Sequence, residues 1–283
     1  MSSHILTFQC PDRAGIQAAV ATLLFNHKAF LIEVTSHSAT NGRFFSRSVF
    51  AGDQGAILNI EAIRRDFAEL ASKFDMEWEL VDTSRKVRTV IAVSKFGHCL
   101  NDLLHRWQLG VLPVDIRAVV SNHPDMRALT EWHGLPYVHI PVTKETKAEA
   151  ETAMMRVIED HDAELLVLAR YMQVLSDDLA RKMSGRCINI HHSFLPSFKG
   201  AKPYHQAHER GVKIIGATAH YVTSDLDEGP IIEQDIERID HKASPDDMVD
   251  IGRDIEARVL ARAVRWHAEH RVLQNAGRTV VFR

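Results

Sequence analysis

Residues 187–196 read Cys-Ile-Asn-Ile-His-His-Ser-Phe-Leu-Pro, an apolar strand that ends in a polar loop. Similar short apolar segments precede it, at residues 89–93, 114–120, 138–140 and 165–168, and helical segments lie between them. Short apolar strands that alternate with helices are typical of a parallel sheet covered on both faces. The pattern therefore predicts an α/β domain.

The C-terminal part of this domain follows a different pattern. Residues 213–222 and 231–239 are strand-like, and no helix separates them. This order indicates a locally antiparallel end to a mostly parallel, Rossmann-like sheet. A long helix is expected from about residue 245 to residue 271, and its buried face carries Ile251, Ile255, Val259 and Trp266.

The first 83 residues have the periodicity of a smaller α+β unit. Strand segments at 5–8, 30–38, 43–50 and 76–81 alternate with two amphipathic helices in the order βαββαβ, which is ferredoxin-like. Asn41-Gly42 marks a hairpin between the middle strands, and Asp12 is the expected N-cap of the first helix. We predict a first domain over residues 1–83, a polar linker over residues 82–88, and a second domain over residues 84–283.

Composition limits the classes of function. The net charge is -3 and dense Lys/Arg runs are absent from the sequence, so we expect no nucleic-acid partner. Three scattered cysteines favour a reducing compartment, the N-terminus does not resemble a signal peptide, and the longest apolar runs are too short to cross a bilayer. The expected location is the cytoplasm, without a membrane partner.

Two polar segments are candidates for chemistry. Asn189 and His191 are two positions apart on a strand, so they project from the same face, at an edge where α/β sheets bind ligands. An amide donor and an imidazole can polarise a carbonyl and handle a proton. The alternative is a loop in which both side chains satisfy backbone groups.

The second segment lies between the last two strands, where three acidic residues precede Gly229-Pro230. By itself this pattern favours a solvated acidic turn. The alternative is that one of the carboxylates, such as that of Asp227, relays a proton beside an imidazole. The 17 histidines include no His-Glu-x-x-His pair, and the cysteines have no paired spacing. We therefore predict no metal site, and the absence of a glycine-rich loop predicts no nucleotide cofactor.

These motifs resemble a known family. Residues 89–283 resemble the folate-dependent formyltransferase fold, with Asn189-x-His191 before Ser-Phe-Leu-Pro, then Lys199-Gly200, then His220-Tyr-Val-Thr leading to Leu226-Asp227-x-Gly-Pro. The whole chain resembles the formyltetrahydrofolate deformylases, because residues 4–83 are similar to an ACT domain and Ser94-Lys95-x-x-His98-Cys99 follows the first strand of the second domain. Lys95, Phe96 and His98 stand where ribonucleotide transferases carry a phosphate-binding loop, and this departure favours water as the acceptor.

The resemblance implies hydrolysis of 10-formyltetrahydrofolate to tetrahydrofolate and formate, which would supply purine biosynthesis and balance the one-carbon pool. It implies that Asn189 donates to the oxyanion, that His191 acts as a proton donor, and that Asp227 accepts a proton through water. The folate is the substrate, so no cofactor is expected. The residues implied to contact it are Met172, Gln173, Val174, Leu175, His220, Lys95 and His98.

For the first domain, the resemblance implies an amino-acid effector, glycine or methionine, bound near Asp12, Arg13 and Gly15. ACT domains pair side by side, which implies a homo-oligomer, either a dimer or a tetramer. Two alternatives stay open. One is a formyltransferase acting on a small amine or ribonucleotide, and the other is a non-catalytic amino-acid or folate sensor.

Overall fold

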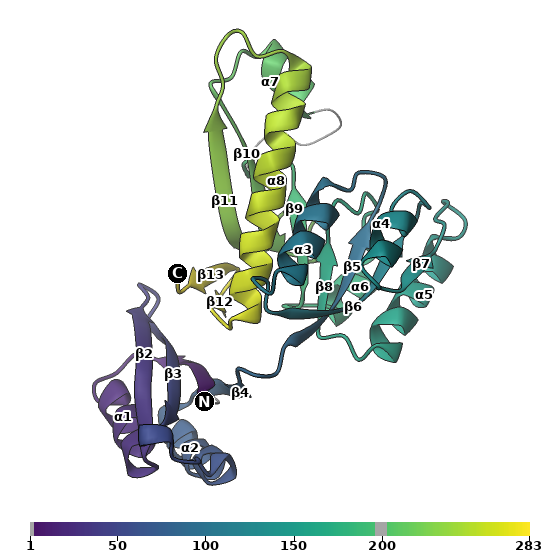
Figure 1. Cartoon of the computed structure of the whole chain (residues 1–283). Coiled ribbons are helices and arrows are strands. Elements are labelled where there is room, and N and C mark those ends of the chain that lie inside the picture. Colours follow the sequence, from purple (N-terminus) through teal and green to yellow (C-terminus); the bar gives the residue numbers. More distant parts are fainter. Residues whose placement is uncertain (1–2, 196–202) are drawn as a thin grey trace. The chain divides into compact units, whose positions relative to one another are not determined.

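The computed structural model describes residues 3–195 and 203–283, so Pro196 and the Lys199-Gly200 motif lie outside the described residues. The chain divides into two compact units (Figure 1). Unit 1 contains the residues up to Lys86 together with Glu269–Leu273 and Val280–Arg283. Unit 2 contains Val87–Ala268 and Gln274–Thr279.

Unit 1 has the predicted βαββαβ order. Its four-stranded antiparallel sheet has the order β2-β3-β1-β4. Two helices cover the sheet, and their apolar faces form a core with β1 that includes Phe8 and Phe67. The elements are β1 (Ser3–Pro11), α1 (Ile16–Asn26), β2 (Ala29–Ser38), β3 (Arg43–Gly52), the 3-10 turn η1 (Asp53–Gly55), α2 (Ile60–Phe74) and β4 (Glu77–Asp82).

The predicted cap of α1 by Asp12 is wrong. The N-cap is Gly15, whose φ of 91° suits a residue without a Cβ, and no side chain caps the helix. The backbone N–H of Asp12 donates to the carbonyl of Gly42 at 2.8 Å, which holds this residue beside the hairpin. Asp12 is thus too far upstream of Ile16 to reach the first turn.

Unit 1 also includes the C-terminal end of the chain, which the sequence-based boundary placed in the second domain. The guanidinium of Arg47 is buried, and its Nε donates to the carbonyl of Glu269 at 3.1 Å. Arg271 donates to Glu33 at 3.2 Å. The helix predicted to reach residue 271 ends at Ala268, and the unpredicted strands β12 (Val272–Asn275) and β13 (Arg278–Val281) follow it.

Unit 2 is built on a seven-stranded mixed sheet with the order β11-β10-β9-β8-β5-β6-β7. Neighbours from β9 to β7 are parallel, and β10 and β11 are antiparallel, as predicted. The strands are β5 (Val87–Val93), β6 (Val114–Ser121), β7 (Tyr137–His139), β8 (Leu165–Leu168), β9 (Cys187–His191), β10 (Ile214–Tyr221) and β11 (Ile231–Arg238). The helices are α3 (His98–Gln108), α4 (Arg127–Trp132), α5 (Lys147–Asp160), α6 (Asp177–Lys182), α7 (Pro203–Glu209) and α8 (Pro245–Ala268).

The strand order changes direction at β5. The chain runs from β5 outward through β6 and β7, then returns to place β8 on the other side of β5. Such a switch point leaves a crevice beyond the carboxyl ends of the two central strands. Apolar side chains on the strands and on α5 fill the core beneath it, including Val90, Leu166 and Met154.

Helix α8 packs along β10 and against α3 (Figure 1). Its buried side chains include Met248, Ile255 and Val259, which repeat at helical spacing. Among the described residues, no helix is both long and apolar enough to span a membrane.

Candidate active site

A cleft of about 210 Å³ opens at the carboxyl ends of β8 and β9, beside the switch point. Its walls come from three loops: the one after β8, the one after β9, and the one between β10 and β11. Most of the predicted site residues line it, namely Met172, Gln173, Val174, Leu175, Asn189, His191, His220 and Asp227.

Asn189 and His191 lie on β9 and project toward the cleft, as their spacing predicts. In the antiparallel pairing with β10, Asn189 is opposite His220 and His191 is opposite Thr218. The amide nitrogen of Asn189 lies 3.3 Å from Nε2 of His220. The other ring nitrogen of His220, Nδ1, donates to the carbonyl of Tyr221 at 2.9 Å.

Asp227 reaches these residues from the loop between β10 and β11. A Cβ at Gly229 would lie 1.7 Å from the carbonyl oxygen of Tyr221, so only glycine lets the loop pass this close to the strand. Asp227 itself has a φ of 59°, a left-handed conformation that aspartate tolerates better than most residues. Together these features turn the carboxylate back over the end of β9.

The carboxylate of Asp227 contacts both imidazoles. Its Oδ1 lies 3.2 Å from Nδ1 of His191 and 3.7 Å from Nε2 of His220. Burial alone would raise the pKa of Asp227, but the hydrogen bonds from His191 and His220 hold that pKa well below its usual value. Asp227 is therefore an anion at neutral pH.

The second ring nitrogen of His191 is buried and has no hydrogen-bond partner among the residues that the structure describes. Buried ring nitrogens are usually paired, so an unpaired one calls for an explanation. A substrate oxygen in the cleft would give this nitrogen a partner. The cleft thus presents the amide of Asn189 and Nε2 of His191, and the anionic Asp227 contacts the opposite nitrogen of the His191 ring.

The loop after His191 is fixed by a buried polar cluster. The hydroxyl of Thr218 donates to the carbonyl of Ser193 at 2.9 Å and accepts from the N–H of Leu195 at 3.1 Å. Gln234 on β11 donates to both Thr218 and the carbonyl of Leu195. Because Thr218 is opposite His191, this cluster holds the end of β9 in place.

The loop after β8 is tied to the neighbouring strand. The hydroxyl of Ser94, directly after β5, accepts from the N–H of Met172 at 2.9 Å and donates to Asn122 at 2.6 Å. The N–H of Ser94 donates to the carbonyl of Arg170. Met172 and Val174 remain about half exposed, at 53% and 54%, so they offer apolar surface to a ligand in the cleft.

Other predicted residues lie elsewhere. Lys95 is exposed and does not line the cleft, and the ring of His98 pairs with Glu256 on α8 at 2.8 Å. In unit 1, Asp12, Arg13 and Gly15 are exposed. The guanidinium of Arg13 is already engaged, because it donates to the carbonyl of Lys73 at 2.7 Å and stacks over the ring of Phe74.

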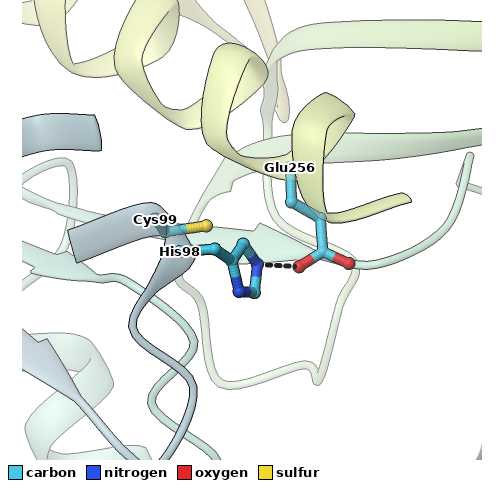
Figure 2. A group of neighbouring side chains, drawn as sticks. All are labelled: His98, Cys99 and Glu256. Atoms are coloured by element: carbon cyan, nitrogen blue, oxygen red, sulfur yellow. Dashed lines mark hydrogen bonds and ion pairs between the residues drawn. The ribbon is translucent and has the colours of Figure 1, made fainter. Parts of the chain in front are cut away.

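Sequence reasoning missed a second polar cluster beside the cleft. Glu256 is 1% exposed and contacts His98, Arg170 and the hydroxyl of Tyr204. Figure 2 shows the ring of His98 pointing from α3 to the carboxylate on α8, with the thiol of Cys99 close by. The pairs are too far apart in sequence for spacing to predict them, although an acidic residue at a core position of α8 was an available signal.

The comparisons with known proteins agree with this geometry. A formyl transferase family model matches residues 87–264, which is most of unit 2. The chain is 54% identical to a formyltetrahydrofolate deformylase of Corynebacterium sp. (strain P-1), over 99% of this chain and 98% of the relative.

Solved structures extend the comparison. A formyltetrahydrofolate deformylase from Burkholderia mallei is 51% identical with a TM-score of 0.95, and the match covers 100% of both chains. A glycinamide ribonucleotide transformylase from Symbiobacterium toebii is 26% identical with a TM-score of 0.66, and it matches 70% of this chain and 95% of its own. The deformylases match both units, whereas the transformylase matches only part of this chain.

Proposed function

Because this chain belongs to the formyltetrahydrofolate deformylase family, we propose that it hydrolyses 10-formyltetrahydrofolate with Asn189, His191 and Asp227 as its catalytic set. The observation that carries the proposal is the meeting of these three side chains at one end of the cleft. Asp227 lies 3.2 Å from His191, and the other nitrogen of that ring has no partner within the described part of the chain. Metal and nucleotide cofactors have no part in the proposal, because the folate is the substrate.

The chemistry follows from the bonds that change. The oxygen of a water molecule adds to the formyl carbon, and the carbonyl becomes a tetrahedral oxyanion. The amide of Asn189 and Nε2–H of His191 donate to that oxygen, where preorganised donors stabilise developing charge. The proton lost by the water passes to Asp227, the carbon–nitrogen bond breaks, and N10 takes a proton from His191. The formic acid so formed loses its proton to solvent, which gives formate and tetrahydrofolate, and return of the proton from Asp227 to His191 restores the starting state.

The anionic state of Asp227 supports this assignment. An imidazolium is a better donor to an oxyanion than a neutral ring. The carboxylate of Asp227, 3.2 Å from Nδ1 of His191, would balance the charge of such a ring. The contact of Asp227 with His220 holds the carboxylate from a second side. Asp227 therefore orients His191 and balances its charge, in addition to accepting a proton.

The loop after β8 is proposed to hold the pterin. Its main-chain groups at residues 169–175 would bond the pterin edge, and Met172, Val174 and Leu175 would cover the ring face. The exposed apolar area of Met172 and Val174 supports this assignment, because burying such area favours ligand binding. Gln173 and His220, which also line the cleft, would supply polar contacts.

The deciding experiment is an assay of purified protein with 10-formyltetrahydrofolate alone, followed by enzymatic detection of formate. Formate released without any added acceptor would support hydrolysis. Turnover only after addition of a small amine or a ribonucleotide would instead support a transferase. Folate binding without turnover under either condition would support a non-catalytic sensor.

For unit 1, we propose an ACT domain that binds an amino acid and takes part in assembly into a dimer or tetramer. The βαββαβ order and the sheet order β2-β3-β1-β4 support this assignment. Glycine and methionine are the first effectors to test, by calorimetric titration of the full chain. If neither binds and neither changes formate release, the effector proposal fails while an assembly role stays possible. Formate made in this reaction is proposed to supply purine biosynthesis.

A further inference from the structure

Arg170, in the loop after β8, has an uncommon backbone conformation. Its φ is 63°, in the left-handed region that arginine rarely adopts. The loop holds this conformation through two hydrogen bonds to the neighbouring strand, from Ala169 N–H to the carbonyl of Ala92 and from Ser94 N–H to the carbonyl of Arg170. Residues with strained backbone conformations are concentrated at functional sites, so we expect the side chain of Arg170 to have a role.

The guanidinium of Arg170 joins two groups that are far apart in sequence. Its Nη1 donates to Nδ1 of His192 at 2.7 Å, and its Nε lies 3.3 Å from the carboxylate of Glu256. The side chain is only 13% exposed, so both contacts form with little competition from water. His192 in turn stacks on His191, with ring centroids 4.9 Å apart and planes 21° apart.

Glu256 is held from three sides. His98 pairs with Oε2 at 2.8 Å, Tyr204 donates to Oε1 at 2.8 Å, and Arg170 faces Oε2. Burial would raise the pKa of Glu256, but the hydrogen bond from His98 and the charge of Arg170 hold that pKa below its usual value. With these partners, the buried carboxylate of Glu256 holds the guanidinium of Arg170 in place.

We propose that Arg170, Glu256 and His98 are positioning residues that hold His192 in one tautomer and press its ring against the catalytic His191. This inference rests on the proposed function, because it assigns these residues to the reaction at His191. Since Nδ1 of His192 accepts from an arginine, its proton sits on Nε2. Burial, followed by the charges of Arg170 and His191, lowers the pKa of His192 to about 4, so this ring is neutral at neutral pH.

A metal ion is the competing explanation of this cluster. One atom each of His98, Cys99 and Glu256 lie within 4.8 Å of one another (Figure 2). However, both carboxylate oxygens already have donors, and a cation would have to share Oε2 with the positive charge of Arg170. Burial also raises the pKa of the Cys99 thiol well above its usual value, whereas metal ligation needs a thiolate.

The central test is the variant Arg170→Gly in the full chain. Glycine adopts a φ of 63° without strain, so this change removes the guanidinium while leaving the loop its backbone conformation. We expect kcat for formate release to fall about 10- to 100-fold, since small misplacements of reacting groups cost factors of this size, and KM to change by less than about twofold. Millimolar guanidinium chloride should restore part of the lost kcat in Arg170→Gly and none in Asn189→Ala.

A matched control is Asp235→Asn, which breaks ion pairs with Arg258 and Arg262 on the same helix α8 but does not touch the cluster. It should keep wild-type kcat. Nitrogen-15 NMR of the histidine rings, assigned with His192→Gln, should show the Nε2–H tautomer of His192 in wild type and a mixture in Arg170→Gly.

Four results would overturn the inference: wild-type kcat in Arg170→Gly, no response to guanidinium, an unchanged His192 tautomer, or wild-type activity that EDTA removes and Zn²⁺ restores. The failure of the proposed function looks different. In that case wild type itself releases no formate, while the NMR measurement still reports on the network.

Discussion

The carboxylate of Asp227 lies 3.2 Å from Nδ1 of His191, although the two residues belong to different parts of the sheet. His191 ends β9, and Asp227 comes from the loop beyond β10. The carboxylate contacts one nitrogen of the ring. The other nitrogen, Nε2, is buried and has no hydrogen-bond partner among the described residues.

Asp227→Asn should reduce kcat for formate release about 100- to 1000-fold, the usual cost of removing one group that stabilises a developing oxyanion. Asparagine keeps the size and tolerates the left-handed backbone, but it cannot take up a proton or balance an imidazolium at His191. Single-turnover formate release would measure the loss, and fluorescence titration with tetrahydrofolate should show unchanged binding. Glu228→Gln, an exposed change in the same loop, is the control. Wild-type turnover in Asp227→Asn would remove this residue from the catalytic set.

Asn189→Ala should cause a loss of similar size, about 100- to 1000-fold in kcat, because it deletes the amide donor aimed at the formyl oxygen. Folate affinity should persist, since the apolar loop after β8 is untouched. Steady-state kinetics and the same titration would separate the two effects. A variant with normal kcat and a raised KM would place Asn189 in ground-state binding instead.

Gly229→Ala should lower kcat while the rest of the domain stays folded. The new methyl group would lie 1.7 Å from the carbonyl of Tyr221, so the loop must shift and carry Asp227 away from His191. Gly110→Ala is a suitable comparison, because that glycine also has a positive φ but no atom within 4 Å of an added Cβ. Circular dichroism should show both variants folded, and only Gly229→Ala should lose activity. Equal activity in the two would contradict the close packing of this loop.

Acid should destabilise the wild-type protein more than His192→Gln. The pKa of His192 is lowered to about 4 in the folded protein, mainly by burial, from 6.5 when unfolded. The unfolded chain therefore takes up a proton first as pH falls, and stability is lost from pH 6.5 down to about pH 4. Between pH 7 and pH 5 this amounts to about 2 kcal/mol.

Urea denaturation at the two pH values would measure that difference, because other titrating groups cancel between wild type and variant. A wild-type loss no larger than that of His192→Gln would show that His192 is not held neutral by its surroundings.

A fragment of residues 3–86 should be less stable than unit 1 of the full chain. It lacks the carbonyl of Glu269, which accepts from the buried Arg47, and it lacks Arg271, which contacts Glu33. An unsatisfied buried donor costs about 1–3 kcal/mol. Thermal melts of the fragment with and without a peptide of residues 269–283 would test this. A fragment that melts at the same temperature in both conditions would show that the C-terminal segments contribute no stability.

Local patterns in the sequence were sufficient to predict most of the elements and part of the site. Strand and helix periodicity gave the βαββαβ unit and the mixed sheet, because side-chain alternation is a local property of the chain. The same alternation put Asn189 and His191 on one face of β9. The motif after β9, taken together with those after β5 and β10, indicated the family, which the comparisons then showed.

Which distant groups meet depends on how the chain packs in three dimensions. By pattern alone the acidic turn favoured a solvated loop, and the resemblance singled out Asp227; the close packing of Gly229 on Tyr221 is what brings this carboxylate to His191. The packing of α8 against α3 gives His98, predicted as a substrate contact, a partner in Glu256 at 2.8 Å. The return of the C-terminal segments to unit 1 likewise depends on the buried Arg47. In each case the deciding term is a contact between residues far apart in the chain, which local periodicity does not encode.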